Sequence, residues 1–384
     1  MKVMGNYILD KAVDLVESIK RESFVRKLYF AKSGNSDAQL EIGNMYLNGY
    51  GIDTDDNEAV MKNDRKAFYW FFKSSEQNNA EAFFCLAFCF FEGVGVQKNN
   101  EKAIYCLHKA AKLGNVDSML KLYEIYGAKN DFEKAISFAK VASENGNSLA
   151  NYMLGYSYMY RDEIGINIEK GLKYLVDAAE SENKNAQSLL GILYFSGDKL
   201  HQDYKKSLYY LEKAASKDDI LAISTLAMCH ENGYGTKKDV FMAIHLYTRV
   251  LDLLLSIDSK SFPGLFDKTL SEIAKYKDLE YIENCIDSPV VFYYLSQEFI
   301  GFDKEQNPEK YIYFLKKSAE MGYDKAQYEL GKMYETGLHV EKNIDKAIEW
   351  FEKAGEQGDD GAIYSLLYLK DPDFFKSNNH SKKD

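Results

Sequence analysis

Apolar residues recur at helical spacing along almost the whole chain, and residues 324–358 show the pattern most clearly. One stripe places an apolar residue at every fourth position and consists of Ala326, Leu330 and Tyr334. Gly337 follows this stripe, where a left-handed C-cap is expected. A second apolar stripe occupies residues 347–354. The segment therefore predicts two helices joined by a turn.

The same two-helix pattern recurs along the chain. The residues equivalent to Leu330 are Ile42, Leu86, Leu122, Leu154, Leu190, Leu226, Leu295 and Leu366. Successive steps measure 44, 36, 32, 36, 36, 69, 35 and 36 residues. A dominant step with local insertions and deletions is typical of a solenoid. Two short helices cannot bury their apolar stripes alone, so we expect the units to stack.

A glycine stands inside the first helix of several units, directly after the residue equivalent to Leu330. These glycines are Gly43, Gly155, Gly191 and Gly331. Glycine inside a helix costs about 1 kcal/mol relative to alanine. Its recurrence in phase therefore predicts that a neighbouring helix packs closely against the backbone there.

Several landmarks that recur together resemble a known family. They are A-x3-L-G-x2-Y, a G-x-G-V-like turn, K-A-x2-W/Y and a K-A-A-x2-G ending, and the turn is clear in residues 93–96. Over residues 33–369 the chain resembles Sel-one-like repeat proteins, relatives of the tetratricopeptide repeat. The resemblance implies an all-α fold, a right-handed superhelical α-solenoid of about eight or nine antiparallel helix pairs. It implies binding of proteins or peptides and no catalytic activity.

The pattern also predicts how the chain is organised. Residues 7–19 and 23–31 read as amphipathic helices of an N-terminal cap. After residue 252 the pattern dissolves, and we interpret the segment as an eroded helix pair, with a linker between two arms as the alternative. The predicted segments are the cap in 1–33, a first array in 34–252, an irregular helical segment in 253–288, a second array with a capping helix in 289–375, and a disordered tail in 376–384.

Charge and cysteine usage narrow the partner and the compartment. The formal net charge of −11 argues against nucleic acid, because phosphate binding needs a basic face. Charged residues interrupt the apolar N-terminus, which predicts neither a signal peptide nor a membrane span. Five cysteines follow no repeat phase and favour a reducing compartment. We expect a cytoplasmic protein, or alternatively an effector secreted without a cleaved signal peptide.

Two groups of cysteine and histidine could in principle carry chemistry. Soft ligands for zinc are offered by Cys85, Cys89, Cys106 and His108. A thiol and a base are offered by Cys229, His230 and His245. Both groups fall at positions where other units carry core or groove residues, and zinc-site spacing is absent. We therefore predict no metal, no cofactor and no enzyme.

The resemblance to tetratricopeptide arrays implies a binding surface on the first helices. In those arrays, the positions two before, two after and five after the residue equivalent to Leu330 face the ligand across a concave groove. The predicted protein-binding residues are Leu40, Asn44, Leu47, Phe84, Phe88, Phe91, Tyr152, Tyr156, Met159, Ile192, Phe195, Tyr328 and Lys332. The same positions of the sixth unit are Ser224, Met228 and Glu231. The alternative is that tight winding packs these side chains against neighbouring first helices.

Other aromatic residues are predicted to serve the fold. Trp70 and Trp350 occupy equivalent positions in the second helices and are expected in the core. Recurring tyrosines of the first helices are expected to be structural, namely Tyr46, Tyr158, Tyr194 and Tyr334.

We therefore predict a non-enzymatic scaffold or adaptor that binds a protein or peptide segment in its groove. The alternative within binding proteins is a bacterial immunity protein or effector that inhibits one partner. A metal- or thiol-dependent enzyme is the reading from another class. The sequence predicts neither the partner nor the oligomeric state.

Overall fold

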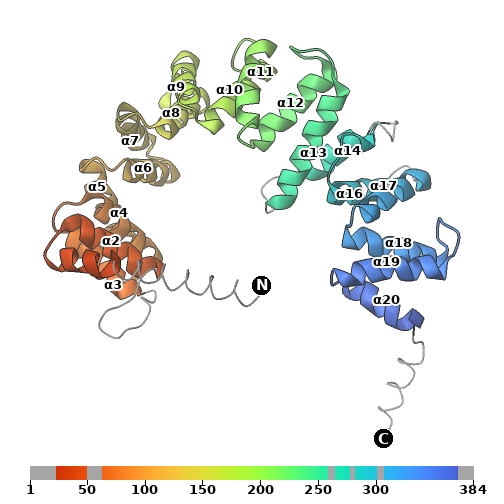
Figure 1. The fold of residues 1–384 in the computed structure, drawn as a ribbon. Coiled ribbons are helices and arrows are strands. Elements are labelled where there is room, and N and C mark those ends of the chain that lie inside the picture. The colour runs from red at the N-terminus through yellow and green to blue at the C-terminus, as the bar shows by residue number, and fades with distance from the viewer. Residues whose placement is uncertain (1–22, 50–62, 258–263, 277–281, 301–306, 371–384) are drawn as a thin grey trace, which may run out of the picture. The chain divides into compact units, whose positions relative to one another are not determined.

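The computed structural model describes residues 23–49, 63–257, 264–276, 282–300 and 307–370. Every regular element in these ranges is a helix, and successive helices pack as pairs (Figure 1). The predicted all-α solenoid of helix pairs is confirmed, while its handedness stays a prediction. The predicted helix in residues 7–19 and the tail in 376–384 lie outside the described residues. The chain forms two compact halves, an N-terminal half of residues 1–183 and a C-terminal half of residues 184–384.

The N-terminal half begins with helical residues 23–32, in which Phe24, Leu28 and Ala31 are buried. Its helix pairs are α2 with α3, α4 with α5, α6 with α7, and α8 with α9. Their bounds are α2 (Ser36–Asn48), α3 (Asp64–Ser75), α4 (Ala80–Glu92), α5 (Asn100–Lys112), α6 (Val116–Ala128), α7 (Phe132–Glu144), α8 (Ser148–Tyr160), the 3-10 helix η1 (Asp162–Ile164) and α9 (Ile168–Glu180).

The C-terminal half repeats this pairing with one interruption. Its bounds are α10 (Lys184–Ser196), α11 (Tyr204–Ala215), α12 (Ile220–Asn232), α13 (Val240–Ser256), α14 (Leu265–Ala274), α16 (Pro289–Gln297), α17 (Pro308–Glu320), α18 (Asp324–Thr336), α19 (Ile344–Glu356) and α20 (Asp360–Lys370). Helix α16 begins at Pro289, the first residue of the predicted second array.

The interruption is a packed part of the C-terminal half. Helix α13 has 17 residues, whereas α11 has 12 and α19 has 13. Helix α14 contacts α13 and α16, and its Leu270 and Ile273 are buried in the core that these helices share. The described residues of 253–288 thus belong to the hydrophobic core of the C-terminal half.

Helix starts and ends follow local capping chemistry. The second helices α3, α5 and α19 are capped by Asn63, Asn99 and Asn343, whose side chains accept from the backbone N–H three residues later. Gly337 ends α18 in the left-handed region at φ 79°, as predicted. Short caps of this kind let each helix stop where its apolar stripe stops.

The recurring glycines mark the seam between the two helices of a unit. A Cβ built on Gly43 would lie 2.5 Å from the ring of Phe71, and one on Gly331 would lie 2.6 Å from the ring of Phe351. Both rings are fully buried. Gly155 and Gly191 meet Leu175 and Leu211 in the same way. The predicted close packing at these glycines is confirmed, because a Cβ at any of them would require the facing side chain of the second helix to shift.

The third unit reverses the sizes across this seam. At the glycine position it has Tyr123, and at the position of Phe71 it has Ala139. Tyr123 packs against a core cluster that contains buried Ala139, and its hydroxyl lies 2.8 Å from the Ser157 hydroxyl. One large and one small side chain therefore fill the seam, whichever helix supplies the large one.

The recurring tyrosine and the lysine of the K-A landmark form one contact. The ammonium of Lys66 lies 5.0 Å from the ring centre of Tyr46, and Lys170 lies 4.4 Å from that of Tyr158. The same contact joins Lys206 to Tyr194 and Lys346 to Tyr334. The sixth unit changes both partners together, to His230 and Met242. These tyrosines are buried or half-buried, as expected of structural residues.

The two tryptophans lie at the edge of the core, which corrects the prediction that they are core residues. Trp70 and Trp350 are half-buried and pack against the clusters of their halves. The fully buried residue is the next one along each helix, Phe71 or Phe351. The helical turn aims that next residue at the first helix, and Trp350 instead carries the Lys353 ammonium 4.1 Å from its ring centre.

Candidate protein-binding site

Two of the predicted binding residues are exposed on first helices of the N-terminal half. Phe88 on α4 is 44% exposed, and Tyr156 on α8 is 41% exposed. Tyr156 belongs to a row of rings along α8, with ring centres 6.4 Å from Tyr152 and 4.8 Å from Tyr160. These side chains present aromatic surface that the helix seams do not use.

The other predicted residues of the N-terminal half are less accessible. A half-buried set packs against the core cluster and consists of Leu40, Leu47, Phe84 and Phe91. Asn44 is also half-buried. Met159 is fully buried, and its side chain lies 2.6 Å from the place where a Cβ on Gly171 would stand. The expectation that Met159 faces a ligand is corrected, because it fills the seam between α8 and α9.

In the C-terminal half, the side chains at the predicted positions mostly make intramolecular contacts. Ile192 and Phe195 pack against the core, and the Phe195 ring meets Tyr234 at 5.8 Å. Tyr328 is half-buried against Phe351 at 5.8 Å, and Lys332 pairs with Glu335 at 2.7 Å. The predicted aromatic surface is therefore concentrated at Phe88 and Tyr156, and it does not extend along all the first helices.

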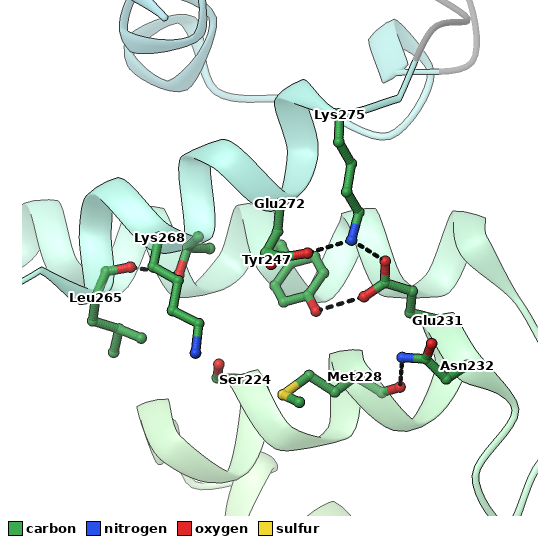
Figure 2. Close-up of a pocket in the computed structure, with 10 residues that line it drawn as sticks. Ser224, Met228, Glu231, Asn232, Tyr247, Leu265, Lys268, Glu272 and Lys275 are labelled. Carbon is green, nitrogen blue, oxygen red and sulfur yellow. Dashed lines mark hydrogen bonds and ion pairs between the residues drawn. The ribbon is translucent and has the colours of Figure 1, made fainter. Parts of the chain in front are cut away.

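The first-helix positions of the sixth unit line a pocket of about 270 Å³ (Figure 2). Ser224, Met228 and Glu231 come from α12, and Tyr247 comes from α13. The opposite wall is α14 with the residue that follows it, which supply Leu265, Lys268, Thr269, Glu272 and Lys275. The repeat pattern identified the α12 side chains, but it contains no information about α14. The helical spacing of Lys268 and Glu272, followed by Lys275 just after the helix, was the available signal.

Glu231 is the electrostatic centre of this pocket. Its carboxylate accepts a hydrogen bond from the Tyr247 hydroxyl at 3.0 Å and pairs with Lys275 (Figure 2). It also accepts a hydrogen bond from the Tyr276 hydroxyl at 2.8 Å. Lys275 also pairs with Glu272. Burial alone would raise the pKa of Glu231, but the donors from Lys275, Tyr276 and Tyr247 hold it below its ordinary value. The carboxylate stays charged and ties residues 275 and 276, beyond the end of α14, to α12.

A second half-buried carboxyl in the C-terminal half has the opposite electrostatics. Glu329 on α18 accepts from the Tyr293 hydroxyl at 3.2 Å and from the Gln297 amide at 3.0 Å. Burial raises the pKa of Glu329, and these neutral donors offset that effect only in part. The difference from Glu231 is the ammonium of Lys275.

The cysteines are buried or half-buried thiols. Burial raises the pKa to about 12 at Cys85 and Cys89, and to about 11 at Cys106 and Cys229. A neutral thiol is a poor nucleophile and a poor metal ligand. Within the described ranges, no group of three or more histidine, cysteine and acidic side chains could hold a metal ion.

Two of the three candidate histidines, His108 and His245, have ordinary structural surroundings. The His108 ring lies 2.8 Å from the Tyr126 hydroxyl, and burial lowers its pKa. His245 is exposed, like Tyr105 and Tyr209 at the same position of other units. The interpretation of His245 as a core or groove residue is corrected, because this position points outward from the second helix.

A membrane-crossing helix would need a long apolar stretch, and none of the helices in the described ranges has one.

Family comparison agrees with the helix pairing. The Sel1 repeat model matches residues 36–79, 84–115, 119–147, 148–183, 184–219, 221–250, 293–323 and 324–359. This chain belongs to the Sel1 repeat family. Sel1 repeat proteins act as protein-interaction scaffolds, and the family is generally non-enzymatic. The stretch from 251 to 292 contains α14 and is not matched by the model, so the far wall of the pocket lies outside the matched repeats.

Comparison with solved structures finds several similar proteins. The protective antigen c5321 of uropathogenic Escherichia coli, which displays an SLR fold, is 23% identical with a TM-score of 0.56, over 90% of this chain and 67% of that one. A Sel1 repeat protein from Oxalobacter formigenes is 21% identical with a TM-score of 0.47, over 90% and 89% of the two chains. The immunity protein PA5088 of Pseudomonas aeruginosa is 20% identical with a TM-score of 0.34, over 62% and 82%.

No curated protein matches the sequence.

Proposed function

We propose that this Sel1 repeat protein is a non-enzymatic scaffold that binds a protein or peptide segment through its first helices. The observation that carries the proposal is the exposure of Phe88 and Tyr156 on α4 and α8. Large exposed rings at positions that the fold does not use are typical of interaction sites.

The repeat itself does not require aromatic residues at these two positions. The equivalent residues are Asn44 in the first unit and Glu124 in the third. A polar side chain is therefore compatible with the helix pair. By contrast, the tyrosines that contact a lysine of the second helix recur in phase and are covered. This contrast separates rings that hold the fold from rings that are free to anchor a partner.

The pocket beside Glu231 is a separate, polar surface within residues 184–384. Its α12 wall is formed by the first-helix positions of the sixth repeat, which correspond to Phe88 and Phe84 in the second repeat. The first-helix positions are therefore apolar in the second repeat and polar in the sixth.

The experiment is to select peptides from a random display library on the full-length protein and to measure their affinity for variants. We expect Phe88→Ala with Tyr156→Ala to lose about 2 kcal/mol or more of binding, roughly thirtyfold in Kd. The matched control is Tyr69→Ala with Tyr105→Ala, which removes two exposed rings from second helices of the N-terminal half. Circular dichroism should show both double variants folded.

Full affinity in the folded Phe88→Ala, Tyr156→Ala variant would contradict the proposal. Loss of binding in the Tyr69→Ala, Tyr105→Ala variant alone would move the site to the second helices. Once a natural partner has been copurified, its activity with and without this protein separates an adaptor from an inhibitor.

A further inference from the structure

The pocket between α12 and α14 contains a lysine that the contacts of the described chain leave unused. Lys268 lines the pocket from α14, and Figure 2 shows its ammonium pointing toward Ser224 on α12. Lys275, the other lysine of the pocket, pairs with Glu231 and Glu272. Lys268 has no ion pair within the described ranges. Its charge is therefore available to a ligand.

Most other polar side chains of the pocket already have partners inside the protein. The Asn232 amide donates to the Met228 carbonyl at 3.0 Å, and the Thr269 hydroxyl donates to the Leu265 carbonyl at 2.7 Å. Ser224 makes no side-chain hydrogen bond in the part of the chain that the structure describes. Two donors that face each other across the pocket, an ammonium and a hydroxyl, thus lack an acceptor.

The electrostatics at this end of the pocket favour an anion. Helix α14 begins at Leu265, and its N-cap Gly264 provides no side-chain cap. The start of a helix carries the positive end of the helix dipole, and Lys268, the fourth residue of α14, adds a like charge there. The two carboxylates of the pocket pair with Lys275, seven residues later and so about 10 Å further along the helix direction. An anion beside Lys268 would offset both positive charges.

We propose that this pocket binds a carboxylate of a protein segment, with the Lys268 ammonium and the Ser224 hydroxyl as its donors. The aliphatic part of the ligand would lie against Met228 and Leu265, which line the same pocket. A cavity of about 270 Å³ accepts a side chain or a chain end, but not a helix about 10 Å across. The inference rests on the proposed function only in that the carboxylate belongs to a protein.

The test follows the ε-methyl signal of Met228 by NMR in the full-length protein, with Met228→Leu to assign it. The probes are three alanine-based pentapeptides. One has a central glutamate and both ends capped, one has a central glutamine and both ends capped, and one is all alanine with a free carboxyl end. We expect a saturable shift with at least one of the two carboxylate peptides and none with the glutamine peptide.

A shift with the glutamate peptide assigns an acidic side chain as the ligand, and a shift with the free carboxyl end assigns a chain terminus. Both results support the proposal, because the two groups present the same carboxylate to Lys268. The absence of a saturable shift with both peptides, or an equal shift with the glutamine peptide, would overturn it.

Variants locate the binding at Lys268. We expect Lys268→Gln to weaken the binding of the carboxylate peptide at least about tenfold, because a charged donor is lost. The matched control is Lys205→Gln, which removes an exposed lysine from the first turn of α11 and should leave the affinity as in the wild type. Equal affinity in Lys268→Gln and the wild type would overturn the proposal.

The same titration separates this site from the surface of Phe88 and Tyr156. The Phe88→Ala, Tyr156→Ala variant should bind the carboxylate peptide as the wild type does, because both rings lie in the N-terminal half. Failure at the pocket would thus leave the proposed role of Phe88 and Tyr156 standing. Loss of the Met228 shift in the folded Phe88→Ala, Tyr156→Ala variant would overturn the assignment of the carboxylate to this pocket.

Discussion

The seams inside the regular units and the attachment of α14 use opposite chemistry. At most seams, a glycine or alanine of one helix faces a large side chain of the other, as at Gly331 and Phe351. The chain that follows α14 is instead tied to α12 by the charged carboxylate of Glu231, with Lys275 and two tyrosine hydroxyls. The seam contact recurs in every unit in some form, whereas the Glu231 contact occurs in one unit.

This difference teaches where a repeat protein can acquire individual properties. A seam depends on volume, and any size-matched pair of side chains satisfies it. A buried polar contact depends on each donor and acceptor being present, because an unmatched partner is left without water. The irregular segment could therefore leave the repeat pattern and still pack, at the cost of depending on particular residues.

The largest effect is expected at the seam itself. Phe351→Ala should destabilise α18 and α19 by about 3–5 kcal/mol, because it empties the space against Gly331. Trp350→Ala should cost clearly less, since Trp350 is only half-buried. Hydrogen exchange in residues 324–356 measures both, and a larger loss in Trp350→Ala would contradict the assignment of Phe351 to the seam.

A size exchange in the third unit sharpens the same point. Tyr123→Gly alone should leave a cavity, and Ala139→Leu alone should overfill the seam, each costing about 2–3 kcal/mol. The double variant recreates the arrangement of Gly155 and Leu175, so it should be more stable than either single variant. Denaturant unfolding of the three variants gives the coupling energy. Additive losses would show that the two positions do not share one space.

A smaller effect is expected for the polar attachment. Glu231→Gln removes the charge that pairs with Lys275 and should destabilise α14 by about 1–3 kcal/mol, seen as faster exchange in residues 265–276. The control is Glu124→Gln, which breaks the solvent-exposed pair with Lys121 and should cost less than about 1 kcal/mol. Equal losses in the two variants would remove any special role from Glu231.

The smallest effect separates the two carboxyls by pH. The pKa of Glu231 is lowered by folding, so the stability it contributes is present above pH 4.5 and is lost as the pH falls through its folded value. The pKa of Glu329 is raised, so its contribution is present below pH 4.5 and is lost as the pH rises through its folded value. Relative to the wild type, Glu329→Gln should therefore gain stability as the pH rises above 4.5. A pH-independent difference would contradict this assignment.

The sequence predicted the recurring parts of the structure and missed the unique ones. Helix pairs, the seam glycines and the cap at Gly337 follow from spacing, because stacking forces each unit to repeat them. Burial at one residue's resolution did not follow, since Met159 and Trp350 differ from their neighbours only in the direction they point. The far wall of the pocket could not be predicted, because the contact of Lys275 with Glu231 joins residues that no periodicity relates.

The connections between helices show where this chain tolerates a change of length. Outside the irregular segment between α13 and α16, links from one unit to the next are short, with α5 joined to α6 by residues 113–115 and α19 joined to α20 by residues 357–359. Among the described residues, turns inside a unit vary from residues 129–131 between α6 and α7 to residues 197–203 between α10 and α11. Successive first helices thus stay in register while the hairpin turn absorbs inserted residues. An epitope tag or a small folded domain placed in the turn at 197–203 would accordingly leave the stacking of the units unchanged, which gives a practical route to labelling the protein away from its first helices.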